Sequence, residues 1–245
     1  MQYSDTHQPL IGFSTGALAL GDWRTGLQRC RDLGVRCVEL SALRFPEYQP
    51  LVEAVSTLDL SDFDYVSVHV PSRYAREEEG AVVRASELIA QREWPMILHP
   101  DTVSDWHGWR DFGRLVCVEN MDKRKPVGRT VEELEECFAQ LPEAQFCFDY
   151  GHARQVDPTM SQARRLLAAF GERLHQIHFS EVDASNQHRL LNRSALSAFA
   201  QIREPQHATV PIILEMLVTA GGAELQIEMA RQFFLAATEN ASVSV

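Results

Sequence analysis

Cysteine is scarce in this sequence and shows no paired spacing. There are five cysteines, and no two of them form a CxxC pair. An odd number without that spacing disfavours both a disulfide framework and a cysteine-based zinc site. The cysteines lie inside predicted strands and helices, where a free thiol packs as a small apolar side chain. We therefore expect the protein to occupy a reducing compartment.

Long apolar runs are also missing. No segment approaches the roughly 18 consecutive apolar residues of a transmembrane helix. The first residues, MQYSDTHQPLIG, lack a basic start followed by a long apolar stretch. We expect a cytoplasmic protein without a membrane partner.

Positive charge is in short supply. The chain has 23 Lys and Arg against 34 Asp and Glu, which gives a net charge of -11 and a pI near 5.3. Such a surface repels polyanions, which disfavours binding to extended nucleic acids. A small, neutral or metal-bridged substrate fits this charge better. A homodimer is expected on the general ground that symmetric dimers are common.

What the sequence does contain is a regular alternation of apolar runs and helix-like segments. The strands are expected at residues 11–15, 35–40, 65–69, 96–99, 115–119, 145–149, 174–178 and 211–215. The helices are expected at 23–34, 51–58, 79–91, 106–113, 131–141, 160–171, 193–202 and 223–237, with Thr130 and Glu133 capping the fifth reciprocally. A chain of 245 residues is close to the ~250 of a (β/α)8 barrel, and no low-complexity linker divides it. We predict a single TIM barrel domain over residues 1–245.

Six of the predicted strands end in a residue that can bind a divalent metal. These residues are His69, His99, Glu119, Asp149, His178 and Glu215. In a (β/α)8 barrel the carboxyl ends of all strands converge on one mouth, where active sites lie. Each residue alone has a plainer explanation, as a hydrogen-bonded structural histidine or a capping carboxylate. Six coincidences, together with the cost of burying such charges without a partner, favour a metal site.

Further candidates follow these strand ends. In DYGHA, His152 comes three residues after Asp149, and Gly151 is expected to let the backbone turn so that both side chains face one site. His188 is the strongest candidate in the polar loop after the strand at 174–178, where Glu181 and Asp183 are more simply surface residues.

Some side chains could contact a substrate above the mouth. Trp106, Trp109 and Tyr74 could form an apolar wall against a carbon chain, although packing of the 106–113 helix on the barrel is the commoner role for such aromatics. The basic residues at 123–125, with Arg129, could meet a phosphate or carboxylate, or could equally be a solvated loop. Arg73 could likewise overhang the mouth.

Taken in order, the stretches VHVPS, VENMD, DYGHA, HFSEVD with the following His188, and IILEM resemble the xylose isomerase-like TIM barrel superfamily. This superfamily includes sugar phosphate isomerases and epimerases and also endonuclease IV. The resemblance covers nearly the whole chain, which is expected to be short for the family, with compact loops. It does not select a substrate.

The epimerase branch implies one metal ion and one kind of chemistry. There, a glutamate, an aspartate, a histidine and a glutamate on strands five to eight hold the ion, which implies Glu119, Asp149, His178 and Glu215. This donor set suits Mn²⁺ best, with Zn²⁺, Mg²⁺, Co²⁺ or Fe²⁺ as alternatives.

The resemblance thus implies a metal-dependent epimerase or isomerase of a sugar, sugar phosphate or polyol ketone. Glu119 and Glu215 would remove and return the proton α to a carbonyl through a metal-stabilised enediolate, and loss of water is a third outcome. The remaining histidines would hold substrate hydroxyls or orient the metal ligands; these are His69, His99, His152 and His188.

The DNA-repair branch implies instead a zinc-dependent phosphoesterase acting on abasic DNA. One ion would be held by His69, His99 and Glu119, a second by the four ligands above, and a third by His152 and His188. That branch has Asp-x-His where this chain has Asn186-Gln187-His188, so a neutral amide replaces a charged ligand. With the negative net charge, this disfavours the DNA-repair alternative. The third alternative is a non-catalytic barrel that holds a metal.

Overall fold

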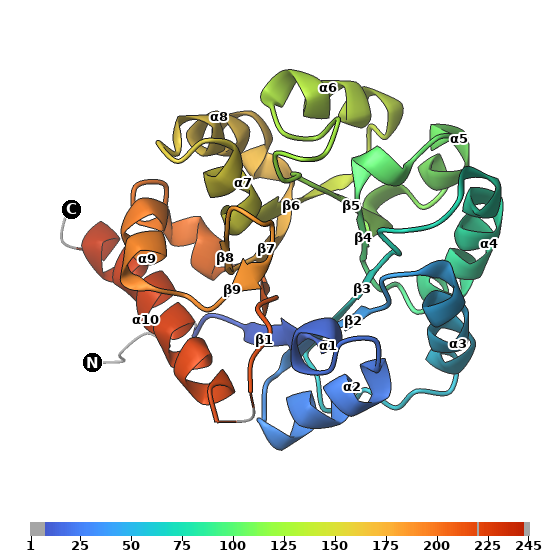
Figure 1. The fold of residues 1–245 in the computed structure, drawn as a ribbon, viewed down its shortest axis with the longest axis horizontal. Helices are drawn as coiled ribbons and strands as arrows, with labels where there is room; N and C mark the ends of the chain where they lie inside the picture. The colour runs from blue at the N-terminus through green and yellow to red at the C-terminus, as the bar shows by residue number, and fades with distance from the viewer. Residues whose placement is uncertain (1–7, 220, 243–245) are drawn as a thin grey trace.

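The centre of the molecule is a closed barrel of eight parallel strands. The computed structural model describes residues 8–219 and 221–242. The strand order is β1-β10-β7-β6-β5-β4-β3-β2, and helices surround the barrel (Figure 1). The strands are β1 (Ile11–Ser14), β2 (Cys37–Ser41), β3 (Tyr65–His69), β4 (Met96–Leu98), β5 (Val116–Glu119), β6 (Gln145–Asp149), β7 (Leu174–His178) and β10 (Ile212–Leu214). The predicted single-domain (β/α)8 TIM barrel is confirmed.

The helices follow the strands in the order that the sequence predicts. The α-helices are α1 (Thr15–Leu18), α2 (Trp23–Asp32), α3 (Phe45–Val55), α4 (Glu79–Ala90), α5 (Trp106–Arg110), α6 (Val131–Gln140), α7 (Tyr150–Val156), α8 (Ser161–Phe170), α9 (Arg193–Phe199) and α10 (Ala223–Ser242). Short 3-10 helices are η1 (Arg76–Glu78), η2 (Pro100–Thr102), η3 (Gly113–Leu115), η4 (Gly171–Arg173) and η5 (Pro205–Ala208).

The core is continuous between the barrel wall and the helices. On β6, Phe146 and Phe148 are fully buried, and the ring of Phe146 lies 5.8 Å from that of Phe170 on α8. Strand residues alternate between the barrel interior and the helices. All five cysteines are buried and free, as their spacing predicts. None of the described helices is long and apolar enough to span a bilayer.

Some local details differ from the prediction. Helix α3 begins at Phe45, six residues before the predicted start, and Pro46 is tolerated because it lies in the first turn. The hydroxyl of Thr130 does cap α6 by accepting from the backbone N of Glu133. The Glu133 carboxylate accepts from the backbone N of Arg129 at 2.7 Å, one residue before the expected N-cap partner.

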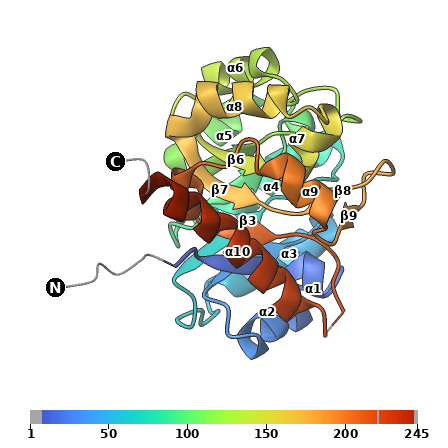
Figure 2. The ribbon, with the colours of Figure 1, turned by 90° about the vertical axis from the view of Figure 1, so that its left-hand side faces the viewer.

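The chain also contains elements that the apolar pattern did not predict. Helix α7 begins immediately after β6, and β8 (Glu181–Val182) pairs with β9 (His188–Arg189) as a small antiparallel hairpin. This hairpin follows the carboxyl end of β7 and projects to the right in Figure 2, on the mouth side of the barrel. It brings the loop with His188 next to the strand ends.

Candidate metal centre

Four predicted residues meet at the mouth of the barrel. Glu119, Asp149 and His178 are the last residues of β5, β6 and β7, and Glu215 directly follows β10. One ligand atom from each lies within 4.8 Å of those of the other three. Glu119, Asp149 and His178 are at most 1% exposed, and the Glu215 side chain is 13% exposed. The fold thus gathers three carboxylates and one imidazole in a buried space; we call these four residues the quartet.

Each member of the quartet has a buried atom that lacks a hydrogen bond. Within the described residues these atoms are Oε2 of Glu119, Oδ2 of Asp149, Nδ1 of His178 and Oε2 of Glu215. The Nδ1 of His178 lies 3.2 Å from Oε2 of Glu215 and 3.4 Å from Oε1 of Glu119. Buried polar atoms are nearly always hydrogen-bonded, and a bound ion is one recognised reason for an exception. Four such atoms, one from each residue of a group whose ligand atoms lie within 4.8 Å of one another, fit a divalent cation.

The charges at the mouth are strongly coupled. Burial would raise the pKa of Glu119, but His178 and His99 outweigh it and hold that pKa well below its usual range. Burial prevails at Asp149 and raises its pKa to about 8. Burial alone would lower the pKa of His152, yet Asp149 and Glu119 raise it to about 10. Protonated imidazoles therefore balance the carboxylates, and a divalent ion would take over this role.

Hydrogen bonds beneath the mouth hold Asp149 in place. Its Oδ1 accepts from the backbone N of His152 at 2.6 Å, so Asp149 is also the N-cap of α7. Asn120 donates from Nδ2 to the Asp149 carbonyl at 2.9 Å and accepts from the Asp149 backbone N at 2.8 Å. These bonds occupy Oδ1 and the backbone of Asp149, which leaves Oδ2 for an ion.

Gly151 is needed for a close contact and not for a turn. It lies inside α7, where a Cβ would come within 2.6 Å of the carbonyl oxygen of Ser180 and of Cγ2 of Val182. The expectation that Gly151 bends the backbone toward the site is wrong. Its missing side chain lets α7 pack against the β7–β8 connection and so brings His152 to the mouth.

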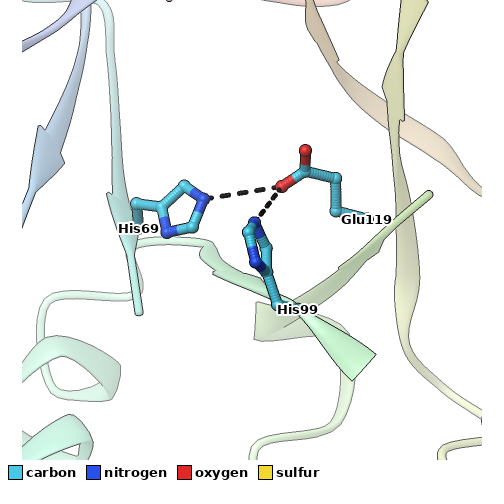
Figure 3. A group of neighbouring side chains, drawn as sticks. All are labelled: His69, His99 and Glu119. Atoms are coloured by element: carbon cyan, nitrogen blue, oxygen red, sulfur yellow. Dashed lines mark ion pairs between the residues drawn. The ribbon is translucent and has the colours of Figure 1, made fainter. Parts of the chain in front are cut away.

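A second potential ligand group adjoins the quartet. His69, His99 and Glu119 offer ligand atoms within 4.8 Å of one another. Figure 3 shows both rings turned toward one oxygen of Glu119: Oε2 lies 3.5 Å from Nε2 of His69 and 3.1 Å from Nε2 of His99. The Nδ1 of His69 lies 2.7 Å from the carbonyl oxygen of Val70, which orients that ring. All six predicted strand-end residues thus converge.

The third group of the DNA-repair branch is not assembled in the same way. The rings of His152 and His188 are close, with centroids 5.4 Å apart. The Nδ1 of His188 lies 2.7 Å from Oγ of Ser180, and the amide of Asn186 donates to Asp122 and accepts from Gln155. Both polar groups of the Asn186 side chain are therefore already engaged in hydrogen bonds. Asp183 binds Ser185 and Arg189 and cannot take its place without breaking those contacts.

Two buried polar residues near the quartet were missed by the sequence analysis. They are Glu39 on β2 and Gln176 on β7, both 0% exposed. Oε2 of Glu39 lies 2.9 Å from Nε2 of His178 and accepts from Nε2 of Gln176 at 2.7 Å. The signal was present, because each is a polar residue inside a predicted strand, in VRCVEL and LHQIH, and not at its end.

A cavity of about 210 Å³ opens above the candidate metal ligands. Its lining includes His69, His99, Glu119, His152, His188 and Glu215, together with Arg73, Arg124 and Lys125. Arg124 pairs with Asp122, and Lys125 pairs with Asp101 at 2.7 Å. Arg129 instead pairs with Glu133 on α6 and does not line this cavity.

The predicted aromatic wall is not formed at this cavity. Trp109 is fully buried in the core, and its Nε1 donates to Glu79 at 3.3 Å. Trp106 and Tyr74 are partly buried against the same core, and none of the three lines the cavity. The tryptophans pack α5 on the barrel, which was the alternative expectation.

No protein-family profile and no functionally curated protein matches this sequence. Solved structures do match. A D-tagatose 3-epimerase-like protein is 16% identical with a TM-score of 0.68, the match covering 95% of this chain and 99% of the other. Endonuclease IV from Thermus thermophilus is 19% identical with a TM-score of 0.64, covering 94% and 100%. A xylose isomerase domain protein from Alicyclobacillus acidocaldarius is 13% identical with a TM-score of 0.63, covering 94% and 99%.

These likenesses bear on length and on fold. The chain covers at least 99% of each of the three structures, so the expectation that it is short for its relatives is wrong for them. At 13–19% identity the likeness establishes the fold and leaves the activity open. The motif resemblance is confirmed at that level: the chain has the fold of the xylose isomerase-like TIM barrels.

Proposed function

We propose that the protein is a divalent-metal-dependent epimerase or isomerase of a sugar, sugar phosphate or polyol ketone. The observation that carries this proposal is the set of four buried atoms without hydrogen bonds, one from each of Glu119, Asp149, His178 and Glu215, among the residues that the structure describes. Three carboxylates and one imidazole form an oxygen-rich donor set that suits Mn²⁺ best. The likeness to a D-tagatose 3-epimerase-like structure is consistent with this chemistry.

Glu119 and Glu215 would share the transfer of the proton α to the substrate carbonyl. A bound divalent ion would polarise a substrate carbonyl and so acidify the neighbouring C–H. Glu119 on β5 and Glu215 after β10 approach from strands that are three positions apart around the barrel. One carboxylate would take the proton from carbon, and the other would return it. Return to the same carbon on the opposite face inverts that centre, and return to the adjacent carbon gives the isomer.

The histidines around the cavity would hold the substrate. His69, His99, His152 and His188 all line it and present ring nitrogens that can bind hydroxyl groups. The small volume, about 210 Å³, favours a substrate portion of monosaccharide size at the metal.

The test is solvent exchange. Protein loaded with Mn²⁺ is incubated in D₂O with a panel of ketoses, sugar phosphates and inosose-type ketones, and loss of a C–H signal is followed by NMR. We expect exchange at the carbon α to the carbonyl for at least one compound. Glu119→Gln and Glu215→Gln should each slow it by about 10²- to 10⁴-fold. Absence of exchange with every compound and each of the five candidate metals would refute the proposal. Wild-type exchange rates in both variants would refute the roles assigned to the two glutamates, whereas bound metal without any exchange would favour a non-catalytic barrel.

A second candidate function is hydrolysis of phosphodiesters at abasic DNA sites. The observation in its favour is the group of His69, His99 and Glu119, which could hold a further ion. Against it stand the engaged amide of Asn186 and the net charge of -11. This alternative requires incision of an abasic oligonucleotide and three tightly bound zinc ions. One ion and no incision would exclude it.

A further inference from the structure

We propose that Glu39 is a positioning residue that selects the tautomer of His178 and so keeps its Nδ1 free to bind the metal. This inference rests on the proposed metal centre and adds a residue outside the quartet. Glu39 lies on β2, across the barrel interior from β7, and its side chain is completely buried.

Three polar atoms, one each from Glu39, Gln176 and His178, lie within hydrogen-bond distance of one another. Oε2 of Glu39 lies 2.9 Å from Nε2 of His178 and 2.7 Å from Nε2 of Gln176, and these two nitrogens lie 2.8 Å apart. The Oε1 of Gln176 accepts from the hydroxyl of Tyr65 at 2.8 Å, which turns the Gln176 amide nitrogen toward Glu39 and His178. The arrangement is fixed from three strands, β2, β3 and β7.

The neutral His178 ring, which is the form that binds a metal, has two tautomers in this geometry. If Nε2 carries the proton, it donates to Glu39, and the lone pair of Nδ1 points at the other quartet residues. If Nε2 is bare, Gln176 can donate to it, and the proton sits on Nδ1 where the metal should bind. A carboxylate is a strong acceptor of an N–H, so Glu39 favours the first state. Metal-binding histidines commonly donate their second ring nitrogen to such a partner.

Burial of Glu39 is otherwise hard to explain. An ionisable side chain with no exposure is costly unless it is paired, and an apolar residue would fill the barrel interior at lower cost. Its Oε1 has no hydrogen bond within the part of the chain that the structure describes. The carboxylate therefore gains its main contacts from His178 and Gln176.

The competing role for Glu39 is that of a metal ligand. Glu39, His69 and Glu215 offer ligand atoms within 4.8 Å of one another. The two roles make different predictions for a glutamine variant. The amide oxygen of Glu39→Gln can still accept from Nε2 of His178, so it preserves tautomer selection, whereas an amide is a poor replacement for an anionic ligand.

The experiment compares metal affinity and metal content in Glu39→Leu, Glu39→Gln and Ser67→Ala. Ser67 is the matched control, because it pairs with Glu39 in the strand register, is fully buried and has a hydroxyl without a hydrogen bond among the described residues. We expect Glu39→Leu to weaken Zn²⁺ binding by about 10- to 100-fold. Glu39→Gln should recover most of the affinity, and Ser67→Ala should match the wild type. Equal losses in the leucine and glutamine variants, or one ion fewer in either, would overturn the proposal.

A second readout needs no variant. Long-range ¹H–¹⁵N correlation spectra of the Zn²⁺-loaded wild type report which ring nitrogen of His178 carries the proton. We expect a protonated Nε2 and a metal-bound Nδ1, and the reverse assignment would overturn the proposal. The two hypotheses fail separately. A wild type that binds no metal removes the metal centre and this inference together, whereas normal Zn²⁺ binding by Glu39→Leu removes only the inference.

Discussion

Asn186 donates a hydrogen bond from its Nδ2 to Oδ1 of Asp122, 3.1 Å away. The residue has a left-handed backbone with a φ of 60°, is 8% exposed, and accepts from Gln155 through its own Oδ1. Its amide therefore links the β8–β9 loop to the loop after β5. An aspartate at this position would place a second carboxylate against Asp122.

The first prediction concerns Asn186→Asp. Like charges in a buried contact should destabilise the metal-free protein by about 1–3 kcal/mol. For a chain of this size, that corresponds to a fall in melting temperature of roughly 2–12 °C. Because Gln155 can still donate to the side chain at position 186, we expect that side chain to stay engaged and no additional zinc to bind. Thermal unfolding and elemental analysis measure both effects. A variant that gains one zinc ion per chain would contradict this expectation and show that a single substitution is enough to complete a third metal site.

The second prediction concerns Gly151→Ala. The new Cβ would meet the Ser180 carbonyl and Val182 at 2.6 Å, so α7 must shift. Overpacking of this kind costs about 1–3 kcal/mol, measurable by urea denaturation. Because Asp149 of the quartet is the N-cap of α7, metal affinity should also fall. Gly171→Ala is the control, because nothing lies within 4 Å of its Cβ position among the described residues. If both variants unfold at the same urea concentration, the close approach at Gly151 is not important for stability.

The third prediction concerns protons released by metal binding. Burial raises the pKa of Asp149 to about 8. Burial alone would lower the pKa of His69, but Glu119 and other acidic groups outweigh it and raise that pKa to about 9. Asp149 is thus protonated in the metal-free protein below pH 8, and the metal must displace that proton. Affinity should therefore rise as the pH increases toward 8, and isothermal titration at pH 7 in two buffers of different ionisation enthalpy should detect at least one released proton per ion.

Asp149→Asn provides the internal comparison. This variant should bind the metal more weakly and should release about one proton fewer, because its side chain no longer titrates. An affinity that is the same at pH 6 and pH 8 in the wild type would contradict the proposed ligand role of Asp149.

The positions of the candidate metal ligands were predictable because they follow from strand direction alone. Once Glu119, Asp149 and His178 are assigned to the ends of parallel strands, barrel closure brings them together. Glu39 and Gln176 were harder to find, since they lie within strands and become significant only when the register shows what each side chain faces across the barrel. The prediction that Trp109 forms part of a substrate wall was wrong for a related reason. Its position in the sequence does not say which side of α5 faces the core.

Several hydrogen bonds of individual side chains could not be predicted from the sequence pattern either. The role of Asp149 as N-cap depends on α7 beginning directly at the strand end, where a glycine had suggested a turn. The tripartite contact among Asn186, Asp122 and Gln155 joins three segments that are far apart along the chain. Such contacts arise from tertiary packing, and no local propensity encodes them.

The last prediction separates a substrate-binding role from a metal-binding role for His69 and His99. Both rings face Oε2 of Glu119, at 3.5 and 3.1 Å. If the quartet holds the only ion, His69→Asn and His99→Asn should each retain the wild-type metal content. Each would lose about one substrate hydrogen bond, which should weaken substrate binding by roughly 3- to 10-fold. His175→Asn is the control, because His175 lies near the opposite, amino end of β7 and should change neither quantity. Loss of one ion per chain in either mouth variant would instead assign His69, His99 and Glu119 a second metal, and the phosphoesterase alternative would then gain support.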